Sequence, residues 1–221
     1  MGNMGLSGGF ISDAGLSFKM VCLHLLEMAY CEVRNARIVT CEWDENAISE
    51  VLTSSINANS ETMQYHITAF VEKRLLNGDL YSVPSSVDDA PRIDIMIGGF
   101  TSGPNVDRTQ CYMEAKNLYC QDFVKSGNLS KTSSIAYAKR YIDTGIDNLL
   151  IGHYPEDTLL LGYVLNGTVQ PAVDIINARL ANCTRAGETI STAIRLEFPC
   201  LVLGLSNHPN GMAIDHCFLQ F

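Results

Sequence analysis

The chain lacks a hydrophobic run long enough to cross a membrane. No apolar stretch reaches the roughly 18 residues that a transmembrane helix needs. The first residues, Met-Gly-Asn-Met-Gly-Leu, also lack the basic segment and the long apolar segment of a secretory signal. We therefore expect a protein with no membrane partner.

The eight cysteines lack the C-x-x-C spacing of zinc sites, and several lie within apolar segments. That pattern indicates reduced thiols and excludes a zinc site or a disulfide framework. The expected compartment is therefore the cytoplasm.

Positive charge is scarce: 15 Lys and Arg residues stand against 24 Asp and Glu residues, which gives a net charge of −9. This balance is unfavourable for a protein that binds nucleic acid. One window of the sequence is basic despite this balance: residues 116–140 contain five cations and a single acid, Asp122. The window is either a local positive rim or an ordinary solvated helix face.

The motifs of several enzyme classes are also missing. No Walker loop, G-x-G-x-x-G motif or Ser-His-Asp arrangement can be recognised. The five histidines have no paired spacing, although His208 and His216 could meet across the last turn. That pair is a weak alternative metal site, which a metabolic α/β enzyme could use.

The chain does contain enough apolar residues, 47% of 221, for one sizeable domain. Hydrophobic spacing predicts an N-terminal extension, residues 1–41, with a helix from Leu16 to Tyr30, followed by a domain over residues 42–221. In that domain we expect mixed α/β structure around one central sheet. The predicted elements are a helix from the N-cap Asp44 to Asn57, strands over 65–76, 92–97 and 110–116, a helix over 133–143 ended by Gly145, a strand over 159–165, a helix over 169–181, and strands over 194–203 and 212–221, with a loop over 98–106.

Two of these strands carry charged residues in a suggestive arrangement. Asp94 lies opposite the isoleucines of its strand, and Glu114 and Lys116 share one face of the next strand. Two acids and a lysine on neighbouring antiparallel strands can hold a divalent metal beside a water, which suits phosphodiester hydrolysis. The alternative is a simple cross-strand salt bridge.

A fourth charged residue, Glu45, belongs to the same face of its predicted helix as Ile48 and Leu52. A carboxylate on an inward face needs a partner, because burying it alone is costly. The alternative is an acid in the first helical turn that favours the helix dipole and reaches outward to solvent.

Together these residues resemble the PD-(D/E)XK, or restriction-endonuclease-like, nuclease superfamily over roughly residues 42–182. Asp94 matches the family's first aspartate, Glu114 and Lys116 match its E-x-K, and Glu45 matches the acid that many members carry on the first core helix. Pro91 departs from the pattern, since it lies three residues before Asp94 instead of next to it.

The resemblance implies an αβββαβ core with a central mixed sheet flanked by helices. It also implies Mg²⁺, with Mn²⁺ as a plausible substitute, held by Asp94, Glu114 and the Ala115 carbonyl, with Glu45 at a second metal or its water. Lys116 would hold the attacking water. The implied activity is a metal-dependent nuclease, a DNA endonuclease of a bacterial defence or restriction system, acting as a homodimer or within a larger complex. The alternative is a catalytically weak or inactive member that serves as a protein-interaction subunit.

Overall fold

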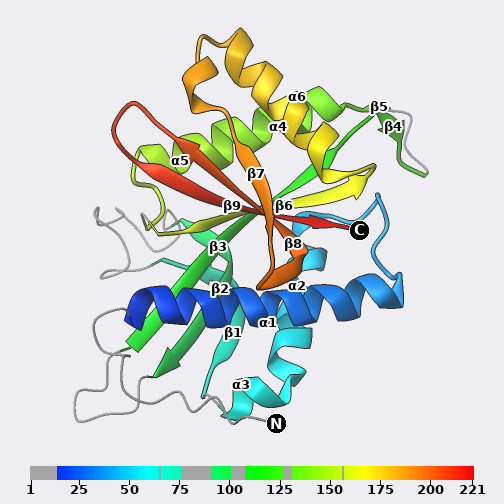
Figure 1. Cartoon of the computed structure of the whole chain (residues 1–221). Helices are drawn as coiled ribbons and strands as arrows, with labels where there is room; N and C mark the ends of the chain where they lie inside the picture. Colours follow the sequence, from blue (N-terminus) through cyan, green and yellow to red (C-terminus); the bar gives the residue numbers. More distant parts are fainter. Residues whose placement is uncertain (1–13, 65, 76–90, 101–107, 127–130, 156) are drawn as a thin grey trace.

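The computed structural model describes residues 14–64, 66–75, 91–100, 108–126, 131–155 and 157–221 (Figure 1). A seven-stranded sheet in the order β1-β2-β3-β6-β9-β8-β7 forms its centre. The sheet is mixed: β3, β6 and β9 are parallel to their neighbours within that trio, and the other pairs are antiparallel. The expected mixed α/β class with one central sheet is confirmed.

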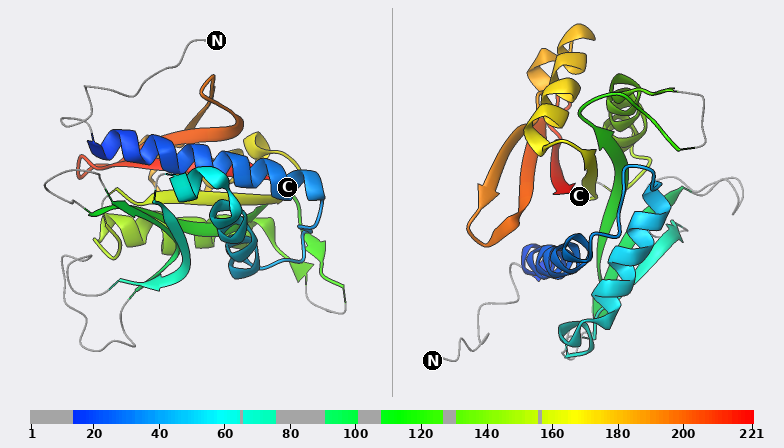
Figure 2. Two further views of the ribbon diagram at one scale, coloured as in Figure 1. Left: turned by 90° about the horizontal axis from the view of Figure 1, so that it is seen from below. Right: turned by 90° about the vertical axis from the view of Figure 1, so that its right-hand side faces the viewer.

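One face of the sheet is covered by α1 (Ala14–Ala36) and α2 (Glu45–Ala58), with the short α3 (Ser60–Gln64) beside them (Figures 1 and 2). Helix α1 runs six residues beyond Tyr30, and its apolar side chains pack in the same cluster as those of α2 and the sheet. The boundary at residue 41 stays a prediction, although α1 shares this core. Residues 1–13, whose Gly- and Ser-rich composition predicts poor order, lie outside the described ranges.

Three strands follow as an antiparallel meander: β1 (Thr68–Arg74), β2 (Arg92–Phe100) and β3 (Arg108–Tyr119). The loop predicted from Gly98 is wrong at its start, because Gly98 pairs with both β1 and β3 and Gly99 pairs with β3. A Cβ at Gly99 would lie 3.1 Å from the Phe18 ring of α1, so this glycine permits close packing of helix on strand.

The other face of the sheet carries α4 (Ser134–Arg140), the π-helix η1 (Tyr141–Ile146), α5 (Asp147–Leu150) and α6 (Val169–Asn182) (Figure 2). The predicted helix end at Gly145 is therefore wrong, because the chain continues through a π-helical turn into α5. Gly145 instead packs against Leu160, whose side chain would lie 3.0 Å from an added Cβ.

The remaining strands are β6 (Leu159–Asn166), β7 (Ser191–Arg195), β8 (Phe198–Asn207) and β9 (Ala213–Gln220). Residues 194–203, predicted as one strand, contain the turn between β7 and β8, which pair antiparallel. A small hairpin of β4 (Phe123–Val124) with β5 (Lys131–Thr132) and the 3₁₀ turn η2 (Ala186–Glu188) were not predicted.

Two composition-based expectations can be compared with these ranges. No helix among the described residues combines the length and apolar character needed to span a membrane. The cysteines are only partly core residues: Cys22, Cys111 and Cys217 are buried, whereas Cys183 and Cys200 are exposed.

Candidate functional site

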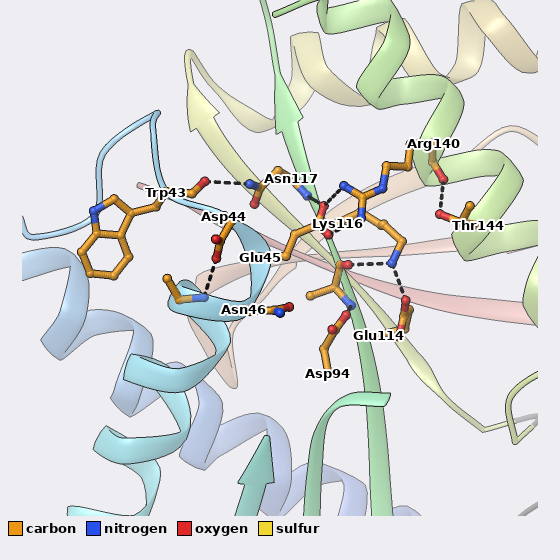
Figure 3. A network of polar contacts seen from close by, with 12 residues as sticks. Trp43, Asp44, Glu45, Asn46, Asp94, Glu114, Lys116, Asn117, Arg140 and Thr144 are labelled. Atoms are coloured by element: carbon orange, nitrogen blue, oxygen red, sulfur yellow. Dashed lines mark hydrogen bonds and ion pairs between the residues drawn. The ribbon is translucent and has the colours of Figure 1, made fainter. Parts of the chain in front are cut away.

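The β2–β3 hairpin brings the predicted carboxylates Asp94 and Glu114 together (Figure 3). The pairing of the two strands runs from Phe100 and Arg108 to Ile95 and Met113. Beyond it, Asp94 Oδ2 accepts a 2.7 Å hydrogen bond from the Ala115 amide, so the carboxylate takes the place of a strand carbonyl. Asp94 thereby lies beside the strand that carries Glu114.

Lys116 completes the group from the same face of β3 as Glu114. Its ammonium donates to Glu114 Oε1 and, at 2.9 Å, to the carbonyl oxygen of Ala115. Both charged residues are nearly inaccessible, with 4% of Glu114 and 5% of Lys116 exposed. Because both lie away from solvent, this pair differs from the surface salt bridge of the alternative interpretation.

The electrostatics favour a neutral Glu114 carboxyl in the absence of a bound metal ion. Burial, followed by the neighbouring charge of Asp94, raises its pKa to about 8, although the charge and the hydrogen bond of Lys116 act in the opposite direction. Burial also raises the pKa of Asp94, against the opposing effect of Lys116. Two carboxyl groups with raised pKa values on adjacent strands are a mark of functional sites.

The oxygen atoms fit a hard divalent cation. Glu114 Oε2 is buried and has no hydrogen-bond partner in the described structure, so it is an oxygen that a cation could satisfy. The Asp94 carboxylate and the Ala115 carbonyl lie beside it. The described ranges contain no cluster of three or more His, Cys, Asp or Glu side chains able to hold a metal. Two carboxylates with a carbonyl and waters are nevertheless a common magnesium site.

Glu45 is on the inward face of α2, as predicted, with 8% of the residue exposed. Asp44 is the N-cap, and its side chain accepts from the Ala47 amide at 2.8 Å. The Glu45 carboxylate, however, is already bound: Arg140 contacts both oxygens at 3.0 and 2.7 Å, and the Asn117 amide donates to Oε1 at 2.9 Å. Its metal role stays a prediction, and its observed partner is Arg140.

Three residues that were not selected from the sequence also line this region. Arg140 comes from the end of α4, and Asn117 donates through its side chain to the Trp43 carbonyl at 2.9 Å (Figure 3). Burial raises the pKa of the Tyr154 hydroxyl, and the charge of the nearby Glu114 carboxylate raises it further. The Arg140–Glu45 contact spans 95 residues of sequence, so no local pattern could indicate it.

The basic window does not form an unpaired positive rim in the described structure. Each of its cations contacts an acid or a carbonyl oxygen: Lys116 with Glu114, Lys125 with the Glu42 carbonyl, Lys131 with Asp122, Lys139 with Asp143, and Arg140 with Glu45. A nucleic acid would therefore compete with these partners for the cations.

The alternative pair, His208 and His216, does lie close together, but Ser206 separates the rings. Its hydroxyl is 2.9 Å from His208 Nε2 and 2.8 Å from His216 Nε2. Burial lowers the pKa of His216 to about 3, and His208 adds to this shift. All four ring nitrogens of the two histidines have protein partners, so neither ring has a nitrogen left to bind a metal.

Comparisons with known proteins returned no match: no family model fits the chain, and neither the curated proteins nor the solved structures contain a significant relative.

Proposed function

We propose that the chain is a Mg²⁺-dependent nuclease that hydrolyses phosphodiester bonds, with DNA as the expected substrate. The observation that carries the proposal is the buried Glu114 Oε2, which has no hydrogen-bond partner among the described residues and lies next to Asp94 and Lys116. A buried carboxylate oxygen left without a partner costs stability unless a ligand satisfies it. The order α2, β1, β2, β3, α4, β6 also agrees with the αβββαβ order of the PD-(D/E)XK resemblance.

Asp94, Glu114 and the Ala115 carbonyl would hold the metal. When bound, Mg²⁺ would lower the pKa of a coordinated water and offset charge on the substrate phosphate. Glu114 must lose its proton to serve as a ligand, and its pKa of about 8 places that change close to neutral pH.

Lys116 has the central chemical role among the protein's own groups. Its ammonium is fixed by Glu114 and the Ala115 carbonyl, so its position costs no reorganisation during the reaction. A cation fixed in a poorly solvated site stabilises negative charge that develops on the phosphate oxygens. Arg140 offers a second, bidentate cation at the edge of the site, where half of its side chain is exposed.

The test is cleavage by the purified full chain. Supercoiled plasmid, single-stranded DNA and RNA are each incubated with Mg²⁺, with Mn²⁺ or with EDTA. We expect cleavage of DNA that requires the metal and is lost in the isosteric variant Glu114→Gln. Metal-independent cleavage, or full activity of Glu114→Gln, would contradict the proposal, and cleavage of RNA alone would change its substrate.

A second candidate is a protein-interaction subunit with this fold but little activity. It is favoured by the pairing of every cation in the basic window and by the exposed side chains at the β7–β8 hairpin, where Ile194 is 68% and Leu196 is 98% exposed. Lack of cleavage by wild type in every metal, together with a stable homodimer or complex, would favour this candidate.

A further inference from the structure

A hydrogen-bonded chain of buried side chains lies on the face of the sheet that carries α4, η1, α5 and α6. It is separate from the candidate metal site. Tyr141 Oη contacts His216 Nδ1 at 2.8 Å, and His216 Nε2 contacts Ser206 Oγ at 2.8 Å. Ser206 Oγ in turn contacts His208 Nε2 at 2.9 Å, and His208 Nδ1 contacts Glu188 Oε2 at 2.6 Å. Four elements are thereby linked: η1, β9, the β8 end and η2.

Counting donors and acceptors gives this chain one direction. Full burial keeps the Tyr141 hydroxyl protonated by raising its pKa, so it can donate to His216 Nδ1. His216 then donates from Nε2 to Ser206, Ser206 donates to His208 Nε2, and His208 donates from Nδ1 to Glu188. In the reverse direction the Tyr141 proton would have no acceptor in a buried site.

The order Ser206, His208, Glu188 is also that of a nucleophilic triad. Ser206 has no exposed surface, however, and its hydroxyl is shared with a second histidine. A substrate could not reach Oγ, so the contacts are suited to holding elements in place.

This hydrogen-bonded chain holds the π-helix η1 in place. At its first residue, Tyr141 is bound to His216. Just after its last residue, Asp147 Oδ1 accepts from Arg185 Nη1 at 2.7 Å, and Arg185 also binds Glu188 at 3.0 and 2.7 Å. The chain therefore fastens both ends of η1, in a helix type that is rare and often found near functional sites.

Arg140 directly precedes η1, and the Thr144 hydroxyl within η1 donates to the Arg140 carbonyl at 2.9 Å. The position of η1 therefore sets where the Arg140 guanidinium meets Glu45. We infer that Tyr141 and His216 are positioning residues, which hold Arg140 against Glu45 by fixing the π-helix. The catalytic consequence rests on the proposed nuclease function, but the geometric claim does not.

The first test is the tautomer of each buried histidine, measured on the wild-type chain by long-range ¹H–¹⁵N NMR. We expect His216 to carry its proton on Nε2 and His208 on Nδ1. A His216 protonated on Nδ1 would overturn the chain as described, because Tyr141 would then be an acceptor with an unsatisfied buried proton.

The second test measures whether Tyr141 affects the Arg140–Glu45 pair. Unfolding of Glu45→Gln, Arg140→Gln and the double variant gives the coupling between the two residues. We expect the coupling to be lost in a Tyr141→Phe background and kept in Tyr30→Phe, which removes another buried hydroxyl, one bound to Gln220. An unchanged coupling in Tyr141→Phe would overturn the inference. Ser206→Ala breaks the same chain and replaces Tyr141→Phe if that variant does not fold.

The third test uses cleavage. Loss of one buried hydrogen bond in Tyr141→Phe is expected to lower kcat/KM about three- to tenfold. Tyr141→Phe should cause no further loss of kcat/KM in an Arg140→Gln background, because its effect passes through Arg140. Additive losses would contradict positioning. If wild type cleaves nothing while the coupling behaves as expected, the positioning of Arg140 stands and the nuclease proposal fails.

Discussion

Asp94 Oδ2 accepts a 2.7 Å hydrogen bond from the backbone amide of Ala115, where the ladder between β2 and β3 has ended. The contact fixes the Asp94 carboxylate next to Ala115. The residues on either side of Ala115, Glu114 and Lys116, are bound to each other. The E-x-K segment and the aspartate therefore form one rigid group on adjacent strands.

Replacement of Lys116 is expected to remove most of the activity. Lys116→Ala deletes the fixed cation that would stabilise the phosphate charge, so the initial rate of plasmid cleavage should fall about 10²–10³-fold. The matched control is Lys131→Ala, because Lys131 is 66% exposed in its side chain and pairs with Asp122 on the surface. The control should cleave like wild type. Equal rates for wild type and Lys116→Ala would refute the assigned role.

Glu114→Gln is expected to change how stability depends on pH. The folded pKa of Glu114 is about 8 and the unfolded value about 4.5, so the folded state binds the extra proton between these values. Wild-type stability from this group is complete below about pH 4.5 and is lost as pH rises to about 8, by about 1.4 kcal/mol per pKa unit of difference. The gain from Glu114→Gln should therefore grow across that window.

The measurement is urea unfolding of both proteins in EDTA at pH 5 and 7, within the pKa window of about 4.5 to 8, and at pH 9, above it. The difference in unfolding free energy should increase from the lowest pH to the highest. A difference that stays constant with pH would show that Glu114 is ionised in the folded protein throughout.

Metal binding should release a proton near neutral pH. Glu114 is protonated below about pH 8 without metal and must be ionised to coordinate, so close to one proton should leave per Mg²⁺ at pH 7. Calorimetric titrations in buffers with different ionisation enthalpies give this number. Above the pKa the release should vanish, and Glu114→Gln should show none. Binding without proton release at pH 7 would place the metal elsewhere.

His216 is expected to make the protein sensitive to acid. Its folded pKa is about 3 and its unfolded value about 6.5, because burial and His208 oppose the charge, against a smaller opposite effect of Asp215. The unfolded state therefore takes up a proton that the folded state refuses, and stability should fall as pH drops below about 6.5.

The slope from this group is about 1.4 kcal/mol per pH unit. The free energy of unfolding should fall less steeply from neutral pH downward for His216→Gln than for wild type, although the variant starts from a lower stability. His153→Gln, at an exposed histidine, should keep the wild-type slope. Identical slopes for wild type and His216→Gln would contradict a neutral buried His216.

Local patterns predicted much of the site. Ile93, Ile95 and Ile97 are fully buried on β2 while Asp94 points to the other side, and Asp44 caps α2 as expected. These features depend on strand alternation and on capping, which act over a few residues. The sequence was therefore sufficient to predict which charges meet on β2 and β3.

Longer-range features could not be predicted in this way. The π-helical turn after Arg140 is held by contacts with His216 of β9 and with Arg185, directly before η2, and Gly145 within it packs against Leu160. The pairing of Glu45 with Arg140 likewise joins α2 to the end of α4, beside the Asn117 amide of β3. No periodicity within either helix encodes that contact, so the sequence suggested a metal role for Glu45 while its arginine partner went unnoticed.

The most direct test of the central claim is a crystal structure of the full chain soaked with Mn²⁺, with anomalous data collected near the manganese edge. We predict an anomalous peak bounded by the Asp94 carboxylate, Glu114 Oε2 and the Ala115 carbonyl, and no such peak in Glu114→Gln crystals. A wild-type crystal at saturating Mn²⁺ with no peak at these three oxygens, or with its peak at another site, would contradict it.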